Sequence, residues 1–495
     1  MEKKRFLFPL MIVLVGFLSY STVSCGDKDD DESKPVVKPD DKSSEKNDST
    51  KEGDKPDTPA VTKAAEGWPS EYGGVMLQAF FWDSYAQTKW SVLTAQADEM
   101  SEYFDLLWIP NSSMTSDYYY NKRQTMGYDP CFWLDHNSCF GTEAELRQMI
   151  KTFRSKGTGI IEDVVVNHKN GLTTWVDFPD EEREGTATAH YSIKWDNVNY
   201  SAICENDECN NSANLSKWSS SGKKTTGARD TGDNFDGFRD LDHTNVQVQQ
   251  NVTTYLQFLL GELGYVGFRY DMVKGFAPAY VGQYNAASQP SFSVGECWDG
   301  NVSVITDWLN GTRKDGVIQS AAFDFPMKYK INSAFQNGQW SALRERMLTT
   351  STGYQRYSVT FVDNHDTGKN PANSSDGPLA KNVEAANAYI MAMPGTPCVW
   401  LKHWQSYKGT IKRLIAARHA AGINNESTIN TSASFPSGYV LCTQGTKGSV
   451  LLVMGNATTE TADFQLAVEG TNFKYYVSNG VDLSAVKAVT DTDSQ

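Results

Sequence analysis

The sequence predicts an α/β fold, a (β/α)8 TIM barrel with an irregular domain inserted after its third strand and an antiparallel β-domain at its C-terminal end. Eight short apolar runs recur along the chain, and helix-like segments such as 143–156 and 246–263 separate several of them. Strands that alternate with helices indicate a parallel sheet, and eight of them close a barrel, which needs roughly 250 residues. The runs are 75–81, 105–110, 158–168, 265–274, 291–298, 321–327, 357–366 and 396–404.

The first 66 residues are predicted to be a leader and a tether. A basic start, an apolar run over 6–18 and small residues before Cys25 are typical of a lipoprotein signal peptide over 1–24. A plain signal peptide and an uncleaved anchor are the alternatives. Residues 26–66 contain no aromatic residue, Leu or Ile. We therefore expect 25–66 to be a lipidated cysteine followed by a disordered acidic linker.

An acidic cluster at 27–32 resembles the surface-export signal of lipoproteins in some Gram-negative bacteria. We expect a protein that is lipid-anchored to the outer membrane and exposed at the cell surface, with a secreted or periplasmic protein as the alternative. The formal charge of −15 opposes nucleic-acid binding and suits a neutral ligand. No second apolar run is long enough to span a bilayer, so membrane contact is expected only through the lipid. A monomer is expected.

The remaining chain is expected to contain three domains. Residues 67–420 should form the barrel. The connection after the third strand is too long for a simple crossover, so 169–243 is predicted to be a domain inserted over the active-site face. After residue 420 short alternating runs predict a β-domain over 421–495. Its strands are predicted at 438–443, 449–455, 461–468 and 473–477.

Seven cysteines follow Cys25. Two pairings within short stretches are possible, Cys204 with Cys209 and Cys131 with Cys139. Cys297 and Cys398 fall in predicted strands and are expected to be buried apolar residues. No zinc-ligand pattern accompanies the cysteines, so no thiol chemistry is assigned.

The predicted strand that runs into a loop over 264–275 carries two opposite charges. Side chains alternate across a strand, so Arg269 and Asp271 point to the same side of this apolar segment. A neighbouring positive charge favours an ionised carboxylate, and an ionised, positioned carboxylate can act as a nucleophile. A structural ion pair at the strand end is the alternative for this segment taken alone.

Other predicted strands also end in polar side chains, and a barrel of this type carries its active site at the face where the strands end. These side chains belong to Asn167, His168, Glu296, His365 and Asp366. Five stretches, at 163–168, 239–243, 267–275, 295–298 and 361–366, together resemble the α-amylase superfamily, glycoside hydrolase family 13. The plant-type subfamily is the most similar, on the basis of Lys274 followed by Gly275, Asp-Thr-Gly at 230–232 and the stretch 393–398.

The resemblance implies three catalytic carboxyl groups. Asp271 matches the family nucleophile, Glu296 the acid/base, and Asp366 the carboxylate that stabilises the oxocarbenium-like transition state. Glycoside hydrolysis needs two carboxyl groups beside the scissile bond, and burial at an apolar strand end would raise the pKa of the proton donor. Substrate contacts are implied for Tyr128, His168, Arg269, Lys274, Trp298 and His365.

A structural calcium ion that joins the inserted domain to the barrel is also implied. The side chains of Asn167, Asp230 and Asp240 match its ligands, as do the backbone carbonyls of Asp233 and Gly275. Calcium prefers roughly six to eight oxygen ligands of these kinds. The alternative is that the acids are ordinary solvated loop residues in an acidic chain.

The function expected from the resemblance is that of a retaining, endo-acting α-amylase. It would hydrolyse α-1,4-glucosidic bonds in starch, glycogen and maltooligosaccharides. One alternative is an α-glucan transglycosylase with the same chemistry. A second, from another functional class, is a non-catalytic glycan-binding protein at the cell surface, which the presence of all three carboxyl groups disfavours.

Overall fold

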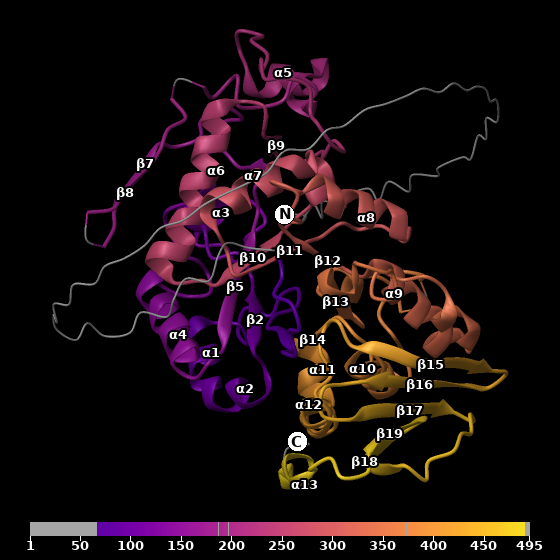
Figure 1. Ribbon diagram of the computed structural model, residues 1–495. Coiled ribbons are helices and arrows are strands. Elements are labelled where there is room, and N and C mark those ends of the chain that lie inside the picture. Colours follow the sequence, from indigo (N-terminus) through magenta and orange to yellow (C-terminus); the bar gives the residue numbers. More distant parts are fainter. Residues whose placement is uncertain (1–66, 187, 197, 373, 491–495) are drawn as a thin grey trace, which may run out of the picture. The chain divides into compact units, whose positions relative to one another are not determined.

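Eight parallel strands close into a barrel in the computed structural model, which describes residues 67–490 except 187, 197 and 373 (Figure 1). Going round the barrel, the order is β1-β14-β13-β12-β11-β10-β5-β2. The strands are β1 (Met76–Gln78), β2 (Leu106–Ile109), β5 (Gly159–Val164), β10 (Gly267–Tyr270), β11 (Phe292–Gly295), β12 (Ala321–Phe323), β13 (Ser358–Phe361) and β14 (Thr396–Trp400). Each predicted run contains one of them, so the predicted barrel is confirmed. The predicted leader and tether, 1–24 and 25–66, lie outside the described residues.

The barrel strands are buried on both faces, as expected for parallel strands covered by helices. Their register decides which side chains meet at the C-terminal ends. Tyr270 of β10 pairs with Gly295 of β11 on one side and with Val164 of β5 on the other. The residues that follow these pairs, Asp271 and Glu296, therefore leave the barrel side by side.

Helices cover the outside of the barrel (Figure 1). They are α1 (Trp90–Ala95), α2 (Ala97–Tyr103), α4 (Glu143–Ser155), α6 (Val246–Phe258), α7 (Pro278–Ser288), α8 (Val302–Gly311), α9 (Phe325–Ile331), α10 (Val383–Ala392), α11 (Leu401–Ser406) and α12 (Lys408–Ala421). A capping box of Thr142 and Glu145 begins α4. The helix predicted over 246–263 is α6 followed by a π-helical turn, η2 (Leu259–Leu263).

The long connection between β5 and β10 forms the predicted insertion. It contains β6 (His168–Lys169), β7 (Glu181–Glu184), β8 (His190–Ile193), η1 (Glu208–Asn210), α5 (Ser212–Trp218) and β9 (Arg239–Asp240). Antiparallel pairing of His168 with Asp240 brings the two ends of this segment together at the barrel. The short helix α5 was not predicted.

Shorter connections also carry structure. After β2 the chain forms β3 (Met114–Thr115), α3 (Ser116–Asn121) and β4 (Pro130–Phe132), and β3 pairs with β4. Single helical turns occur at η3 (Val273–Gly275), η4 (Asn332–Gln336), η5 (Trp340–Arg344), η6 (Gln355–Tyr357) and η7 (Thr367–Lys369). Two of these, η3 and η7, directly follow the strand ends that carry predicted catalytic residues.

A five-stranded antiparallel sheet follows α12, which confirms the predicted C-terminal β-domain (Figure 1). Its order is β15-β16-β17-β19-β18. The elements are β15 (Thr428–Phe435), β16 (Gly438–Gln444), β17 (Ser449–Gly455), β18 (Phe464–Gly470), β19 (Phe473–Ser478) and a terminal helix, α13 (Ser484–Ala488). The sheet packs on the barrel through Tyr475, whose hydroxyl donates to the Met391 carbonyl at 3.2 Å. β15 was missed because its sequence is polar and, at the edge of the sheet, none of its residues is buried.

All seven described cysteines are free, so neither possible disulfide is present. Instead, the Cys131 thiol donates to the Met114 carbonyl, and the Cys139 thiol donates to that of Thr125. Cys297 and Cys398 are buried, as predicted.

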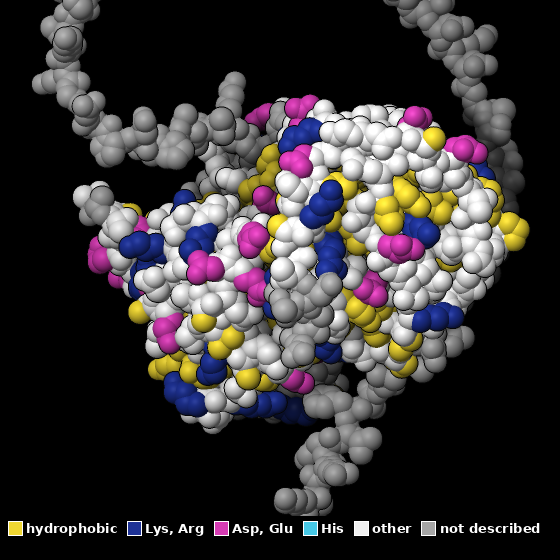
Figure 2. Space-filling model, turned by 90° about the horizontal axis from the view of Figure 1, so that it is seen from below, with side chains coloured by type: hydrophobic (Ala, Val, Ile, Leu, Met, Phe, Trp, Pro, Cys, Tyr) yellow, Lys and Arg dark blue, Asp and Glu magenta, His cyan; other side chains and the backbone are white. Residues whose placement is uncertain are grey.

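Within residues 67–490, apart from the three undescribed positions, no helix combines the length and the apolar character that a membrane crossing needs. Figure 2 shows acidic and basic side chains interspersed on one face of the molecule.

Candidate active site

A fully buried arginine organises the predicted catalytic centre. Nη1 of Arg269, in β10, lies 2.7 Å from Oδ1 of Asp163 and 2.6 Å from Oδ1 of Asp271. Nη2 lies 2.5 Å from Oε1 of Glu296, without the alignment of a hydrogen bond. The expected orientation of Arg269 and Asp271 to one side is therefore confirmed. One guanidinium group contacts both carboxyl groups that the sequence assigns to the bond-breaking step.

Glu296 is placed to hold a proton at neutral pH. It follows β11, and its Oε2 accepts a hydrogen bond from the Met272 backbone at 3.2 Å. Burial raises its pKa; the charge of Arg269 opposes this, and Asp271 and Asp366 add to the increase, so that the pKa lies at about 8. A carboxyl group of this kind suits a general acid.

Asp366 has the opposite electrostatic character. Burial alone would raise its pKa, but His365, Lys369 and Arg269 outweigh burial and hold the pKa below its ordinary value. Oδ2 of Asp366 lies 3.1 Å from Nε2 of His365. Burial lowers the pKa of His365 to about 3, so this ring is neutral near pH 7. Asp366 is therefore ionised where Glu296 is protonated.

Tyr128 connects the two sides of the site. Its hydroxyl lies 2.8 Å from Oδ2 of Asp163 and 2.7 Å from Nε2 of His365, and its ring stacks on His365 at 5.5 Å between centroids. The Gln78 amide nitrogen lies 2.7 Å from Nδ1 of the same histidine, which assigns the proton of the neutral ring to Nε2. Tyr128 and His365 thus form one wall beside the carboxyl groups.

The other predicted substrate residues lie farther round the rim. Nε2 of His168 donates to the Tyr128 carbonyl at 2.9 Å, and Phe235 and Phe238 of the insertion stack on its ring. Lys274 lies 3.3 Å from Asp299. Trp298 stacks on Phe325 and donates to the Tyr329 hydroxyl at 2.9 Å. These contacts do not test the substrate roles, which remain predictions.

Two further residues reach Asp366 and were not predicted. The Trp82 indole nitrogen donates to Oδ1 of Asp366 at 3.1 Å, and Nζ of Lys369 lies 3.1 Å from the same oxygen. Trp82 lies four residues beyond the end of β1, and Lys369 lies in the turn that Asp366 begins. Their positions just after barrel strands were the available signal, although nothing in the sequence links the two.

The predicted calcium ligands converge although they come from separate stretches. Nδ2 of Asn167 lies 3.4 Å from Oδ1 of Asp240. The Asp233 backbone donates to the Lys274 carbonyl at 2.8 Å. A Cβ added at Gly275 would lie 2.0 Å from Oδ1 of Asn167. The loop of the insertion, the end of the third barrel strand and the turn after β10 therefore lie against one another.

The donor set fits a calcium ion. Oδ2 of Asp230 is buried without a hydrogen-bond partner. Burial, with Asp230 and Asp207 among the neighbouring acids, raises the pKa of Asp240 to about 8. In the described part of the chain, no three His, Cys, Asp or Glu side chains are grouped to bind a metal by themselves. The predicted set instead combines carboxylate, amide and carbonyl oxygens, all of which calcium accepts.

Residues 115–431 match the family described as alpha amylase, catalytic domain. The chain belongs to this family. Sequence relatives include the probable alpha-amylase 2 of Arabidopsis thaliana, 27% identical over 81% of this chain and 92% of that protein. Glucan 1,4-alpha-maltotetraohydrolase of Stutzerimonas stutzeri is 28% identical over 81% of this chain and 73% of that protein. A solved α-amylase from Anoxybacillus has a TM-score of 0.59 and 13% identity, and the match covers 83% of this chain and 98% of that one.

Membership of the α-amylase family makes the protein a glycoside hydrolase and confirms the resemblance that the sequence suggested. The three predicted carboxyl groups follow the ends of barrel strands. The family chemistry requires two carboxyl groups that flank one glycosidic bond.

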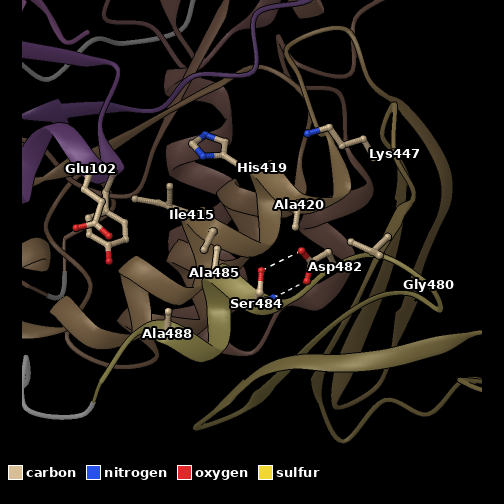
Figure 3. Close-up of a pocket in the computed structure, with 13 residues that line it drawn as sticks. Glu102, Ile415, His419, Ala420, Lys447, Gly480, Asp482, Ser484, Ala485 and Ala488 are labelled. Carbon is tan, nitrogen blue, oxygen red and sulfur yellow. Dashed lines mark hydrogen bonds between the residues drawn. The ribbon is translucent and has the colours of Figure 1, made fainter. Parts of the chain in front are cut away.

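A separate cavity of about 600 Å³ is lined by no residue of this site. It is lined by α12, α13 and the loop that carries Lys447, and Ser484 bonds to Asp482 at its edge (Figure 3).

Proposed function

We propose that this α-amylase-family protein is a retaining, endo-acting α-amylase that hydrolyses α-1,4-glucosidic bonds in starch, glycogen and maltooligosaccharides. The observation that carries the proposal is the pair of carboxyl groups on one guanidinium group. Asp271 is ion-paired with Arg269 at 2.6 Å, while Glu296 has a pKa raised to about 8. One group is thereby suited to attack and the other to donate a proton.

The reaction would proceed in two steps. Asp271 attacks the anomeric carbon while Glu296 protonates the departing glycosidic oxygen, which leaves a glycosyl ester on Asp271. Glu296, now ionised, removes a proton from water, and the resulting attack releases the sugar and restores both groups. Asp366, ionised beside the sugar, stabilises the positive charge that develops in each transition state.

The sheet register supports retention over inversion. Adjacent strands lie roughly 4.8 Å apart, and Asp271 and Glu296 each directly follow a paired residue, Tyr270 and Gly295. Retaining enzymes hold their two carboxyl groups about 5 Å apart, whereas inverting enzymes leave a wider gap for a water molecule. A common contact with Arg269 favours the shorter separation.

Endo action needs a test of its own, because the names of the sequence relatives describe different modes of cleavage. One is named as an alpha-amylase and another as a maltotetraohydrolase. The test is to incubate residues 67–495 with soluble starch, and with maltooligosaccharides labelled at the reducing end, and to resolve the products over time. Early products of mixed length and a rapid loss of iodine staining support endo hydrolysis.

Other results of the same experiment would contradict the proposal. Accumulation of maltotetraose alone from the first minutes indicates exo action. Products longer than the labelled substrate indicate glycosyl transfer. If NMR in the first minutes shows that the anomeric configuration of the product is inverted, the two-step route is excluded.

We further propose one structural calcium ion held by Asn167, Asp230, Asp240 and the carbonyls of Asp233 and Gly275. The buried, unpartnered Oδ2 of Asp230 supports this. A bound calcium ion would supply the positive charge that the buried acids otherwise lack. The residues themselves fix the end of the third barrel strand and the turn that follows Asp271.

A lipid anchor at Cys25 and exposure at the outer face of the outer membrane remain proposals from the sequence, as does a monomeric state. The apolar leader and the acidic linker support the anchor and its exposure. Exposure suits a polymeric substrate, because starch is too large to cross an outer membrane. A single acyl chain anchors a protein only weakly, so a multiply acylated form is expected.

A further inference from the structure

Asp366 is held by two residues from different strand ends. Oδ1 accepts a hydrogen bond from the Trp82 indole at 3.1 Å and lies 3.1 Å from Nζ of Lys369. The ammonium of Lys369 also lies over the Trp82 ring, 3.2 Å from its centroid. Trp82, Lys369 and Asp366 thus form a closed triangle in which each residue contacts the other two.

The triangle is continuous with the aromatic wall of the site. The Trp82 ring lies 5.5 Å from that of Tyr128 and 5.9 Å from that of His365. Oδ2 of Asp366 faces Nε2 of His365 at 3.1 Å. Both oxygens of the carboxylate are therefore contacted by protein groups, which restrict it to one orientation.

Lys369 is a cation in direct contact with Asp366 at neutral pH. His365 is neutral near pH 7 because burial lowers its pKa to about 3. Arg269 contacts three other carboxyl groups, those of Asp163, Asp271 and Glu296, at 2.5–2.7 Å. Lys369 contacts Asp366 directly, although 44% of its side chain is exposed. A lysine this exposed would sample many rotamers without the Trp82 ring, because a cation is attracted to an indole face.

We propose that Lys369 and Trp82 are positioning residues that hold Asp366 ionised and correctly oriented for the sugar at the cleavage site. The proposal rests on the proposed function, in which Asp366 stabilises the transition state. Lys369 acts through Asp366 and Trp82 acts on both. Removing the lysine charge should therefore affect the transition state more than substrate binding.

The test compares Lys369→Met, Lys369→Arg and Trp82→Phe with the wild type, using an aryl maltooligosaccharide over a range of pH. Lys223→Met is the matched control, since the Lys223 ammonium likewise lies over an aromatic ring, 3.6 Å from the centroid of Tyr200 in the insertion. Lys369→Met should lower kcat by about tenfold with little change in KM, because a misplaced catalytic group costs rate. It should also move the acidic limb of the kcat profile to higher pH. Lys369→Arg should restore most of the rate, and Lys223→Met should change neither.

A double-mutant cycle separates positioning from simple stabilisation. Acarbose affinity is measured by calorimetry for Lys369→Met, Asp366→Asn and the double variant. If Lys369 acts through Asp366, the lysine substitution weakens binding only when Asp366 is present. A raised KM with unchanged kcat, or equal effects of Lys369→Met in both backgrounds, overturns the proposal. An Asp366→Asn variant that keeps full activity would instead contradict the proposed function.

Discussion

Asp271 is the residue whose assignment is simplest to test. Asp271→Asn keeps the shape of the side chain beside Arg269 but removes the attacking carboxylate. Turnover should fall by about four orders of magnitude or more, in line with losses for other nucleophiles, while circular dichroism and the melting temperature show an intact fold. Asp236→Asn, in the exposed loop of the insertion, is the control and should keep full activity. More than about a tenth of wild-type activity in Asp271→Asn would contradict the assignment.

Glu296 should show its role through the leaving group of the substrate. Glu296→Gln cannot donate a proton, so starch hydrolysis should fall by about a hundredfold or more. An activated aryl glycoside needs less acid assistance, so its pre-steady-state burst should be largely retained. Stopped-flow release of the phenol measures this. Equal losses on both substrates would show that Glu296 is not the acid.

Burial of Glu296 also gives stability a pH dependence. The pKa of this carboxyl group rises from 4.5 to about 8 on folding, so between those values the folded chain retains a proton that the unfolded chain releases. Stability therefore decreases as pH rises through this window. Glu296→Gln should melt above the wild type, and the difference should be larger at about pH 8 than at about pH 5. Calorimetry at several pH values measures the difference in melting temperature. A difference that does not change with pH would show that Glu296 is not the source of the pH dependence.

Residues differ in how far the sequence alone reveals them. Strand alternation was enough to predict that Arg269 and Asp271 meet, because Asp271 directly follows the strand that contains Arg269. Glu296 and Asp366 follow other strands, and their roles required the resemblance to a known family. Lys369 and Trp82 were missed because their contact joins loops 287 positions apart in the chain, which no local pattern encodes.

At the scale of elements, the insertion is the segment whose stability we expect to depend on the proposed calcium ion. Chelation should lower the melting temperature and the activity together, because calcium binds only the folded ligand set, and added calcium should restore both. Asp230→Asn should weaken calcium binding in a titration, whereas Asp236→Asn, from the same loop, should not. Metal-free protein that keeps its full melting temperature and rate would contradict the site.

Elements with apolar patterns were predicted well, and polar ones were not. The barrel strands and β16, β17 and β19 are buried and β-rich, so hydrophobicity located them to within a few residues. β15 reads TINTSASF, and its pairing with β16 is what makes it a strand. α5 has no buried residue, so it has no apolar face from which a helix is recognised.

At the scale of the whole molecule, the location of the protein is the prediction still to be tested. Cys25→Ala should abolish lipidation, so the protein should be released or remain unprocessed, while wild-type protein should be digested by protease added to intact cells. Fractionation with immunoblotting measures both. The starch-degrading activity of the purified variant should be unchanged, because Cys25 lies outside the barrel sequence. Wild-type protein found freely soluble in the periplasm would contradict the anchor.

The pairing of Tyr270 with Gly295 has a consequence for how this enzyme can change. Strands shift only in whole residues, and a slip by one residue turns every side chain to the opposite face. In a closed barrel such a slip would have to be shared by all eight strands. The relative backbone positions of Asp271 and Glu296 can therefore change only in discrete steps. Substitutions around the site can therefore tune acidity and substrate choice gradually, whereas moving the backbone of Asp271 relative to that of Glu296 would need a new register.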